Sequence, residues 1–471
     1  MQNEKRTPIM VCVFFTMEDI MIINGETEVL GVLGNPIKHT FSPDIHNALS
    51  KRIGINAVYL PFRVDGSLDN VIKGAFAANV KGLNVTVPFK CDVIPFLESI
   101  DKNAIKIGAV NTLVRGKKGY IGYNTDAPGL FRALVKLGVD ISNKKAIILG
   151  AGGASRAVAA MLVMHGVECI YVINRTKKKA EKIAELSNKI VPLTVDEYKK
   201  VPKGKYLFFQ CTSLGLKEED SLLIEEDSFY DMAEYGFDLV YNPAMTPFTR
   251  MMENKNVPYN NGLYMLIYQA VIAYELWNDV KVEDETVEYV VNLLRKKIYG
   301  DNIILTGYMG SGKTSVGMAI ARKLGLKMID TDAYIEDKKK IYINEFFNLY
   351  GEEAFRNIET EILRELCSEC FNTVISTGGG MPLSRINRDL MHENGNVIYL
   401  TTESNTIFER LKDDSSRPLL KTDNGESLMN KINFMIEKRR PYYECGADII
   451  VSTDGKTPEQ IADEIITLIH R

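Results

Sequence analysis

The stretch Gly307-Tyr-Met-Gly-Ser-Gly-Lys-Thr314 decides the fold of the carboxyl-terminal part of this 471-residue chain. It follows the apolar residues 302–306, which predict a strand, and precedes residues 315–324, which predict a helix. The pattern GxxxxGK[ST] requires this strand, loop and helix order. Its glycines allow backbone N–H groups to surround phosphate oxygens, and the amino end of the helix adds a favourable dipole. The stretch therefore predicts a phosphate-binding loop in an α/β domain.

Two positions in this loop carry the phosphate chemistry. The lysine of such a loop, here Lys313, bridges the β- and γ-phosphates of ATP, and the hydroxyl of Thr314 can bind Mg²⁺. The residues that we predict to bind ATP from the loop are Gly310, Ser311, Gly312, Lys313, Thr314 and Ser315. After the next predicted strand, Asp330 and Asp332 provide one carboxylate for the metal ion and one for an acceptor hydroxyl. A helix cap is the plainer alternative for such a pair, because Asp favours that position.

Four further motifs follow in this part of the chain. They are Gly351-Glu-Glu-Ala-Phe-Arg-Asn-Ile-Glu359, Gly378-Gly-Gly380 after the predicted strand 373–376, Ser416-Arg-Pro-Leu-Leu420, and Arg439-Arg-Pro-Tyr-Tyr443. Consecutive glycines at a strand end allow a ligand to approach the backbone closely. The polar stretch 412–427 around Arg417 predicts a mobile lid. With the loop and the aspartate pair, these motifs make residues 302–471 resemble the shikimate kinases.

This resemblance implies how the substrate of the second half is bound. It implies that Arg356 and Arg439 bind the carboxylate of shikimate, and two separated arginines suit a carboxylate-bearing acceptor. Arg440, next to Arg439, leaves a second candidate for one of these contacts. The ring hydroxyls are expected to lie against a further set of residues, namely Asp332, Gly378, Gly379 and Gly380.

The resemblance also implies the catalytic roles in an ATP- and Mg²⁺-dependent phosphorylation of the 3-hydroxyl. Asp332 is expected to orient or deprotonate that hydroxyl, and Asp330 to hold Mg²⁺ together with Thr314. Lys313 and Arg417 are expected to act on the transferred phosphate, with Arg417 arriving from the lid and also binding ATP. These assignments agree with the chemistry, because phosphoryl transfer depends mainly on positioning and on charge stabilisation.

A second glycine-rich turn lies in Lys145-Ala-Ile-Ile-Leu-Gly-Ala-Gly-Gly-Ala-Ser-Arg156. It separates a predicted strand from the predicted helix 155–165, which is the layout of a dinucleotide pyrophosphate site. Ser155 takes the third glycine position, so the pattern is a variant. The cofactor-binding residues that we predict from the turn are Gly150, Ala151, Gly152, Gly153 and Ala154.

The end of the following strand indicates which dinucleotide binds. An NAD-specific domain usually has Asp or Glu there, about 20 residues on, for the ribose 2′-hydroxyl. Here Asn174, Arg175 and Thr176 stand at that turn, followed by lysines at 177–179. A carboxylate would repel a 2′-phosphate, whereas Arg175 and Thr176 can bind one, so we predict NADP(H). A basic helix start in solvent is the alternative, and it explains the lysines better than the turn.

Upstream, hydroxyl and amide side chains recur after predicted strands. The motifs are Gly34-Asn-Pro-Ile-Lys-His-Thr-Phe-Ser-Pro-Asp-Ile-His-Asn47, Asn84-Val-Thr-Val-Pro-Phe-Lys90, Gly108-Ala-Val-Asn-Thr112 and Gly122-Tyr-Asn-Thr-Asp126. Together with the glycine-rich turn, they make about residues 28–297 resemble the shikimate dehydrogenases. The resemblance implies NADPH-dependent reduction of 3-dehydroshikimate to shikimate. It implies that Lys90 and Asp126 are catalytic and that seven residues bind substrate: Thr40, Ser42, Asn84, Thr86, Asn111, Tyr241 and Gln269.

A Lys paired with Asp suits ketone reduction, because Lys90 can donate to the developing alkoxide while Asp126 orients it. Three positions depart from the family pattern: Thr40 stands for the usual Ser, Asn261 for the usual Asp, and Tyr264 is unusually bulky. These departures leave open a quinate or mixed quinate/shikimate enzyme that uses NAD or NADP. A ligand-sensing protein that has lost its chemistry is a further alternative, against which the presence of the catalytic residues argues.

Composition and order of the elements predict an α/β fold throughout. We expect an extension over 1–24, disordered or added by a misplaced start, a substrate domain over 25–125 plus 264–298, and a Rossmann-type NADP domain over 126–263. The residues 264–297 are helical by period. A linker of 299–301 leads to a P-loop kinase domain over 302–471, with a central parallel sheet and helices on both sides.

Net charge and cysteine content limit the classes of partner and the cellular compartment that we expect. The net charge of -4 provides no basic footprint for nucleic acid or for an anionic membrane, so we expect small-molecule substrates. Seven cysteines are few for this length and odd in number, which favours a reduced cytoplasmic protein over a disulfide framework. The sequence does not indicate an oligomeric state.

Overall fold

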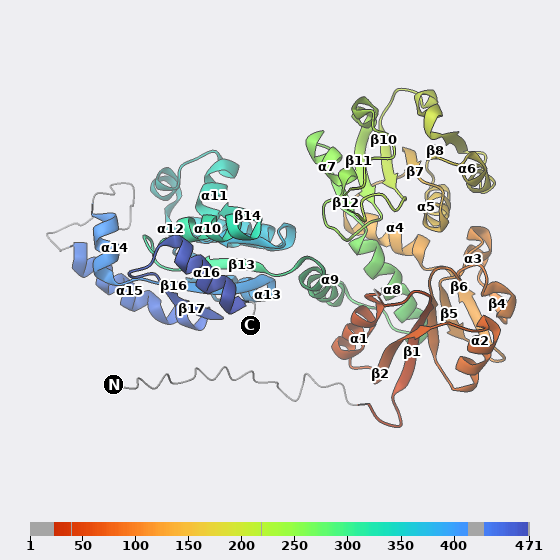
Figure 1. The fold of residues 1–471 in the computed structure, drawn as a ribbon, viewed down its shortest axis with the longest axis horizontal. Coiled ribbons are helices and arrows are strands. Elements are labelled where there is room, and N and C mark those ends of the chain that lie inside the picture. Colours follow the sequence, from red (N-terminus) through yellow and green to blue (C-terminus); the bar gives the residue numbers. More distant parts are fainter. Residues whose placement is uncertain (1–22, 39, 218, 413–427, 470–471) are drawn as a thin grey trace. The chain divides into compact units, whose positions relative to one another are not determined.

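The computed structural model describes residues 23–38, 40–217, 219–412 and 428–469. The chain divides into two compact units, 1–291 and 292–471 (Figure 1). Helix α9 (Asp284–Tyr299) begins in the first unit and ends in the second. Only Gly300 and Asp301 separate this helix from strand β13 (Asn302–Thr306). Arg417 and almost all of the predicted extension 1–24 lie outside the described residues.

The first unit begins with a mixed six-stranded sheet of order β2-β1-β3-β5-β6-β4. Its strands are β1 (Glu28–Gly34), β2 (Ala57–Arg63), β3 (Gly82–Val85), β4 (Ser99–Ile100), β5 (Thr112–Arg115) and β6 (Tyr120–Tyr123). Leu83 belongs to the core formed with helices α2 (Leu68–Ala77) and α3 (Lys102–Ile107). Successive side chains of a strand point to opposite faces, so Gly82 faces the other way. There Trp277 of helix α8 (Leu263–Asn278) fills the space that a side chain at Gly82 would need.

The second sheet of this unit is parallel, with the order β12-β11-β10-β7-β8-β9. Its strands are β7 (Lys145–Leu149), β8 (Cys169–Asn174), β9 (Ile190–Thr194), β10 (Tyr206–Gln210), β11 (Ala233–Asp238) and β12 (Tyr259–Asn261). Ile148 packs into one core with helices α4 (Asp126–Lys136), α5 (Gly153–Met164) and α6 (Lys177–Ala184). Ile147 packs on the opposite face, with helix α7 (Pro247–Asn254). The strand order and the two covered faces are those of a Rossmann-type sheet, with a ligand-binding switch point beside β7.

The second unit contains a five-stranded parallel sheet of order β14-β15-β13-β16-β17 (Figure 1). The strands besides β13 are β14 (Lys327–Asp330), β15 (Thr373–Ser376), β16 (Gly395–Thr401) and β17 (Ile449–Ser452). Ile303 and Leu305 are buried with helices α10 (Lys313–Leu324) and α16 (Pro458–Ile469), whereas Ile304 is buried with α12 (Ile343–Glu369) and α13 (Arg385–Asn394). The remaining helices are α11 (Thr331–Lys339), α14 (Ser404–Leu411) and α15 (Leu428–Cys445).

The predicted α/β class is confirmed, including the Rossmann-type sheet and the parallel sheet with helices on both faces. One element differs, because the helical stretch 264–297 is two helices, α8 and α9. Asp279 ends α8 in the left-handed conformation, with φ of 51°, and such a residue stops a helix. The division of the first unit into a substrate and a cofactor domain stays a prediction.

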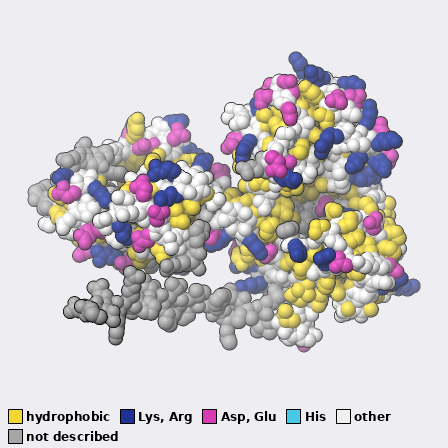
Figure 2. Space-filling model, in the orientation of Figure 1, with side chains coloured by type: hydrophobic (Ala, Val, Ile, Leu, Met, Phe, Trp, Pro, Cys, Tyr) yellow, Lys and Arg dark blue, Asp and Glu magenta, His cyan; other side chains and the backbone are white. Residues whose placement is uncertain are grey.

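The surface agrees with the absence of a strong charge bias in the sequence. On the face shown in Figure 2, Lys and Arg side chains are interspersed with Asp and Glu side chains on both units. No helix in the described part of the chain is long and apolar enough to cross a membrane.

Candidate active sites

In the first unit, a cavity of about 440 Å³ lies where several strands end. It is lined by all nine residues that the resemblance assigned to catalysis and substrate binding: Thr40, Ser42, Asn84, Thr86, Lys90, Asn111, Asp126, Tyr241 and Gln269. Strand β5 runs antiparallel to β3, so Asn111, just before β5, lies at the same edge as the residues that follow β3. The fold therefore brings this predicted set together, while the individual roles stay predictions.

Lys90 and Asp126 form an ion pair in the wall of this cavity. Lys90 Nζ lies 2.6 Å from Asp126 Oδ2, and the two side chains are 30% and 15% exposed. Asn111 Nδ2 donates a hydrogen bond to Asp126 Oδ1 at 2.9 Å, and Asn111 Oδ1 accepts the backbone N–H of Thr125 at 2.7 Å. An ammonium group has three donors, so Lys90 can still donate to a ligand while it is bonded to Asp126.

A buried aromatic group fixes the amide of Asn84 behind the cavity. Tyr59 donates to Asn84 Oδ1 at 2.7 Å, and Asn84 Nδ2 donates to the backbone oxygen of Asn111 at 3.2 Å. Burial raises the pKa of Tyr59 well above its usual value, so the hydroxyl remains a donor. The ring of His46 stacks on Tyr59 with centroids 4.2 Å apart. The sequence did not single out Tyr59, because nothing local distinguishes a strand tyrosine that reaches a ligand-binding amide.

The predicted pyrophosphate turn connects β7 to α5 at the switch point. Gly150 has φ of 107°, and a side chain there would lie 2.8 Å from Thr212 and 3.1 Å from the backbone of Cys211. The positions after it are open, because a Cβ at Gly152 or Gly153 would meet nothing within 4 Å. A phosphate group can therefore approach the backbone at the amino end of α5 closely, as a dinucleotide site requires. These residues fit the predicted cofactor.

Ser155 explains the departure from the usual third glycine. Its side chain is fully buried, and its Oγ accepts the backbone N–H of Gly152 at 3.0 Å. A small hydroxyl therefore fits against the sheet and also caps the helix. Next to this turn, Asn174 ends β8 and its Nδ2 donates to the backbone oxygen of Thr176 at 2.9 Å, while Arg175 and Thr176 are exposed. The adjacent strands β7 and β8 thus place the pyrophosphate turn and the predicted 2′-phosphate residues at one edge.

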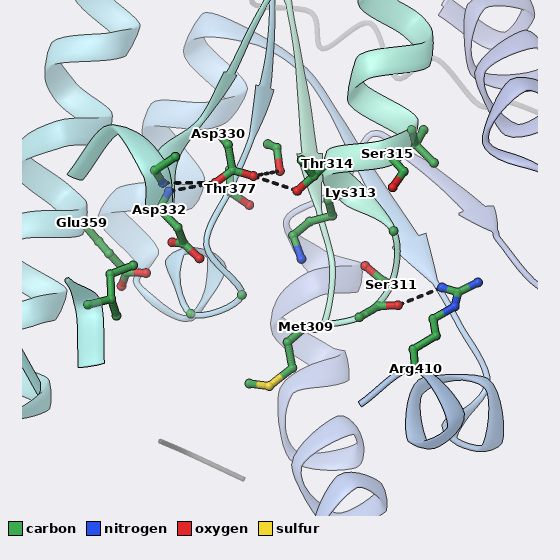
Figure 3. Close-up of a pocket in the computed structure, with 18 of the residues that line it drawn as sticks. Met309, Ser311, Lys313, Thr314, Ser315, Asp330, Asp332, Glu359, Thr377 and Arg410 are labelled. Carbon is green, nitrogen blue, oxygen red and sulfur yellow. Dashed lines mark hydrogen bonds between the residues drawn. The ribbon is translucent and has the colours of Figure 1, made fainter. Parts of the chain in front are cut away.

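In the second unit, a cavity of about 820 Å³ is lined by the phosphate-binding loop and by all of the predicted substrate-binding residues except Gly378 (Figure 3). Gly310 and Gly312 have φ of 78° and 92°, which favours glycine. Lys313 Nζ donates to the backbone oxygens of Gly307 and Tyr308 at 2.9 and 3.1 Å. The lysine is therefore positioned by its own loop, with the open helix end beside it. The loop fits the phosphates of ATP.

Asp330 caps a helix, which is the plainer of the two interpretations that the sequence left open, and its role in metal binding stays a prediction. Its Oδ1 accepts the backbone N–H groups of Asp332 and Ala333 at 3.1 and 3.4 Å, so it caps α11. Its Oδ2 accepts the hydroxyl of Thr314 at 2.8 Å and that of Ser376 at 3.1 Å. The same carboxylate thus caps a helix and stands beside the loop threonine, where the two oxygens fit a Mg²⁺ ion shared with phosphates.

Arg356 is held between two carboxylates next to the glycine triplet. Its Nη1 lies 2.5 Å from Glu359 Oε2 and its Nη2 lies 2.8 Å from Glu352 Oε1. A side chain at Gly380 would lie 1.7 Å from Arg356 Nη1, and one at Gly378 would lie 2.6 Å from Asp332 Oδ1. A side chain at Gly378 or Gly380 would therefore displace the end of the Asp332 or Arg356 side chain. The sequence alone explained these glycines only as access for a ligand.

The structure distinguishes Arg439, which the family motif favours, from the neighbouring Arg440. Arg439 is buried and lines the cavity, whereas Arg440 is exposed and is not part of the lining. Arg410 on α14 was not predicted, yet it lines the cavity and donates to the backbone oxygen of Gly310 at 2.8 Å (Figure 3). No local sequence pattern distinguishes Arg410, because it reaches the phosphate-binding loop only through the tertiary packing of α14. Arg417 lies outside the described residues.

Glu359 is a third residue whose role sequence reasoning missed. Its side chain is 1% exposed, and burial raises its pKa to about 7 while the charge of Arg356 acts in the opposite direction. An acid three residues after an arginine on a helix faces the same side, and that spacing could have indicated the pair.

In the described part of the chain, no group of three or more His, Cys, Asp or Glu side chains could hold a metal ion.

These features define the class of the protein: a chain that combines a Rossmann-type oxidoreductase site with a P-loop phosphotransferase site. Known families divide it in the same way. The model of the shikimate dehydrogenase substrate binding domain matches residues 32–113, and that of shikimate / quinate 5-dehydrogenase matches residues 132–216. The shikimate kinase model matches residues 309–470.

Individual relatives cover the first unit. The shikimate dehydrogenase (NADP(+)) of Desulforamulus reducens is 39% identical over 290 residues, which is 59% of this chain and 97% of that protein. A chorismate mutase/shikimate 5-dehydrogenase fusion protein from Clostridium acetobutylicum is 33% identical, with a TM-score of 0.54 over 58% of this chain and 98% of that one. Shikimate 5-dehydrogenase from Thermus thermophilus, solved with NADP(H) and shikimate, is 30% identical, with a TM-score of 0.51 over 56% of this chain and 99% of that one. The chain belongs to the shikimate dehydrogenase family and carries a shikimate kinase domain after it.

Proposed function

We propose that this chain catalyses two consecutive reactions: NADPH-dependent reduction of 3-dehydroshikimate to shikimate, and ATP-dependent phosphorylation of shikimate at its 3-hydroxyl. The observation that carries the proposal is the Lys90–Asp126 ion pair, with a separation of 2.6 Å, in a cavity whose polar lining is otherwise hydroxyl and amide. Such a lining suits a substrate with several hydroxyls and one reacting carbonyl. The kinase domain that follows would take the product as its acceptor.

In the reduction, the chain's own residues hold and stabilise the reacting oxygen. Lys90 Nζ donates a hydrogen bond, and then a proton, to the carbonyl oxygen as negative charge develops there. Asp126 keeps Lys90 in place, and Asn111 fixes the second oxygen of Asp126. The residues 150–154 and 174–176 would hold NADPH, which supplies the hydride when bound.

In the phosphorylation, Arg356 and Arg439 would bind the substrate carboxylate through charge-assisted hydrogen bonds. Asp332 would orient the 3-hydroxyl and accept its proton. Lys313 would stabilise negative charge on the phosphate oxygens, as transfer depends on such stabilisation. Asp330 and Thr314 would hold Mg²⁺, which would neutralise negative charge on the phosphates when bound.

A quinate or mixed quinate/shikimate activity is the second candidate for the first site. It is favoured by Thr40, which differs from the usual serine, and by the match to a shikimate / quinate 5-dehydrogenase model over 132–216.

The six cysteines in the described part of the chain are free thiols. They support the cytoplasm, a reducing compartment, as the proposed location.

The test is to incubate the full chain with 3-dehydroshikimate, NADPH, ATP and Mg²⁺ and to identify the products. We expect shikimate 3-phosphate, with one NADPH oxidised and one ATP consumed per molecule formed. Omission of ATP should stop the reaction at shikimate. Comparison of kcat/KM for shikimate and quinate, with each dinucleotide, distinguishes the two candidates. Failure to form shikimate from 3-dehydroshikimate would contradict the proposal.

A further inference from the structure

The loop that follows β11 contributes one wall of the dehydrogenase cavity. It spans residues 239–246, between β11 and α7, and Leu239 and Tyr241 line the cavity. The ring of Tyr241 meets the ring of Phe41 edge to face, with centroids 6.2 Å apart. Phe41 follows β1 of the first sheet, whereas Tyr241 follows a strand of the Rossmann-type sheet. The loop therefore forms the wall of the cavity at the point where Tyr241 meets Phe41.

A single buried carboxylate fastens both ends of this loop. Asp238, the last residue of β11, is fully buried. Its Oδ1 accepts the backbone N–H of Val240 at 3.0 Å, and its Oδ2 accepts the hydroxyl of Thr246 at 2.6 Å. These bonds join residues at the start and at the end of the loop, with Tyr241 between them. Movement of either end would carry Tyr241 away from its place in the cavity.

The surroundings leave the start of the loop little freedom. The backbone N–H of Leu239 donates to the backbone oxygen of Gln210 at 2.9 Å, and the backbone N–H of Gly262 donates to that of Val240 at 3.3 Å. A Cβ at Gly262 would lie 2.2 Å from the backbone oxygen of Leu239, so the loop packs directly on the start of α8. The far end is packed as well, because Thr246 is fully buried and a Cβ at Gly215 would lie 2.8 Å from the Cβ of Thr246. The Asp238 carboxylate is the group that bonds both ends of the loop, through Val240 and Thr246.

Keeping a carboxyl group in this position is costly to the fold. Burial raises the pKa of Asp238 to about 7, although the bonds from Thr246 and Val240 act in the opposite direction. A buried polar group destabilises a protein unless it is hydrogen-bonded, and an apolar residue would avoid the cost. A geometric role for the two bonds accounts for its presence.

We propose that Asp238 is a positioning residue of the dehydrogenase site, which holds the loop 239–246 so that Tyr241 contacts the substrate. Asp238 touches neither substrate nor cofactor in this proposal and acts through Tyr241. The inference rests on the proposed dehydrogenase function.

The first test is Asp238→Asn in the full chain, assayed as shikimate oxidation at saturating NADP⁺. Asn keeps the shape but replaces one acceptor oxygen with a donor group, so one of the two bonds is lost. Loss of one such bond should raise KM for shikimate about tenfold and leave kcat within about threefold. The kinase activity of the same molecules is the internal control, and it should not change.

A double-mutant cycle separates this role from general damage. In a Tyr241→Ala background, Asp238→Asn should change KM by less than about twofold, because the contact it positions is already absent. Equal effects of Asp238→Asn with and without Tyr241 would overturn the proposal. So would an unchanged KM in Asp238→Asn.

A second pair of variants covers the case in which Asp238→Asn does not fold. Thr246→Val removes the hydroxyl that bonds Asp238 and also weakens the start of α7. Thr249→Val is the matched control, because its hydroxyl accepts the backbone N–H of Thr246 at 2.8 Å and caps the same helix. Only Thr246→Val should raise KM, and equal effects would reject the inference. A wild-type chain that does not oxidise shikimate would instead reject the proposed function, and this inference with it.

Discussion

Acid is expected to destabilise the first unit through the buried imidazole of His46. Burial lowers its pKa from 6.5 to about 3, with a smaller opposing contribution from Asn84. In the unfolded chain the imidazole takes up a proton near pH 6.5, whereas in the folded chain it stays neutral until about pH 3. The stabilisation is therefore complete above pH 6.5 and is lost as the pH falls through this window. Each pKa unit corresponds to about 1.4 kcal/mol, so a fall to about pH 4.5 should cost about 2 to 3 kcal/mol.

The assay uses the one tryptophan of the chain. Trp277 is buried in the first unit, and its ring lies 5.1 Å from that of His46. Its fluorescence during urea denaturation therefore reports on the unfolding of this unit. Other groups also make stability depend on pH. Asp238, whose pKa is raised, has an effect of the opposite sign. Its effect is the same in the wild type and in a variant without the imidazole, so the difference between the two proteins isolates His46.

The matched variant is His46→Phe, which keeps an aromatic ring against Tyr59. Between about pH 6.5 and about pH 4.5, the wild type should lose about 2 to 3 kcal/mol more stability than His46→Phe. The difference should appear as a larger fall of the urea midpoint at constant slope. Parallel profiles for the two proteins would refute the assignment of acid sensitivity to His46.

Three further predictions concern the two sites. Lys90→Ala should lower dehydrogenase turnover at least about 100-fold and leave the kinase activity intact, and Lys313→Ala should have the reverse effect. Both activities are assayed separately on each variant. If neither variant lost its own activity, the roles assigned to Lys90 and Lys313 would be wrong. Gly380→Ala places a methyl 1.7 Å from Arg356 Nη1, and a displacement on the order of 1 Å should reduce kcat/KM for shikimate phosphorylation about 100-fold, with KM for ATP as the control. Arg175→Ser should weaken NADP binding about tenfold or more and NAD binding less than about twofold; fluorescence titration measures both, and equal losses would exclude a 2′-phosphate contact.

The sequence grouped the candidate residues of both sites through motifs that resemble known families. Lys90 and Asp126 were paired by that resemblance, and the structure brings them together because β3 and β6, which precede them, lie on either side of β5 and both run antiparallel to it. The sequence left two alternatives open for Asp330: the structure shows the helix cap, and the hydrogen bond with Thr314 is compatible with the metal role, which stays a prediction.

The residues that escaped prediction owe their places to tertiary packing. Arg410 reaches the phosphate-binding loop from a helix about 100 positions later in the chain. Asp238 lies in an apolar strand whose local pattern explains its burial but not its bonds to Val240 and Thr246. Tyr59 has ordinary strand propensity, and only the register of the sheet directs its hydroxyl to Asn84.

The short connection through α9, Gly300 and Asp301 has a consequence for metabolic balance. Every copy of this polypeptide carries one oxidoreductase unit and one kinase unit, so the two units are synthesised in a one-to-one ratio. Transcription, message decay and proteolysis then change both capacities together and cannot correct a mismatch between them. Under the proposed function, the ratio of the two turnover rates and the supply of NADPH and ATP set how much intermediate accumulates between the steps.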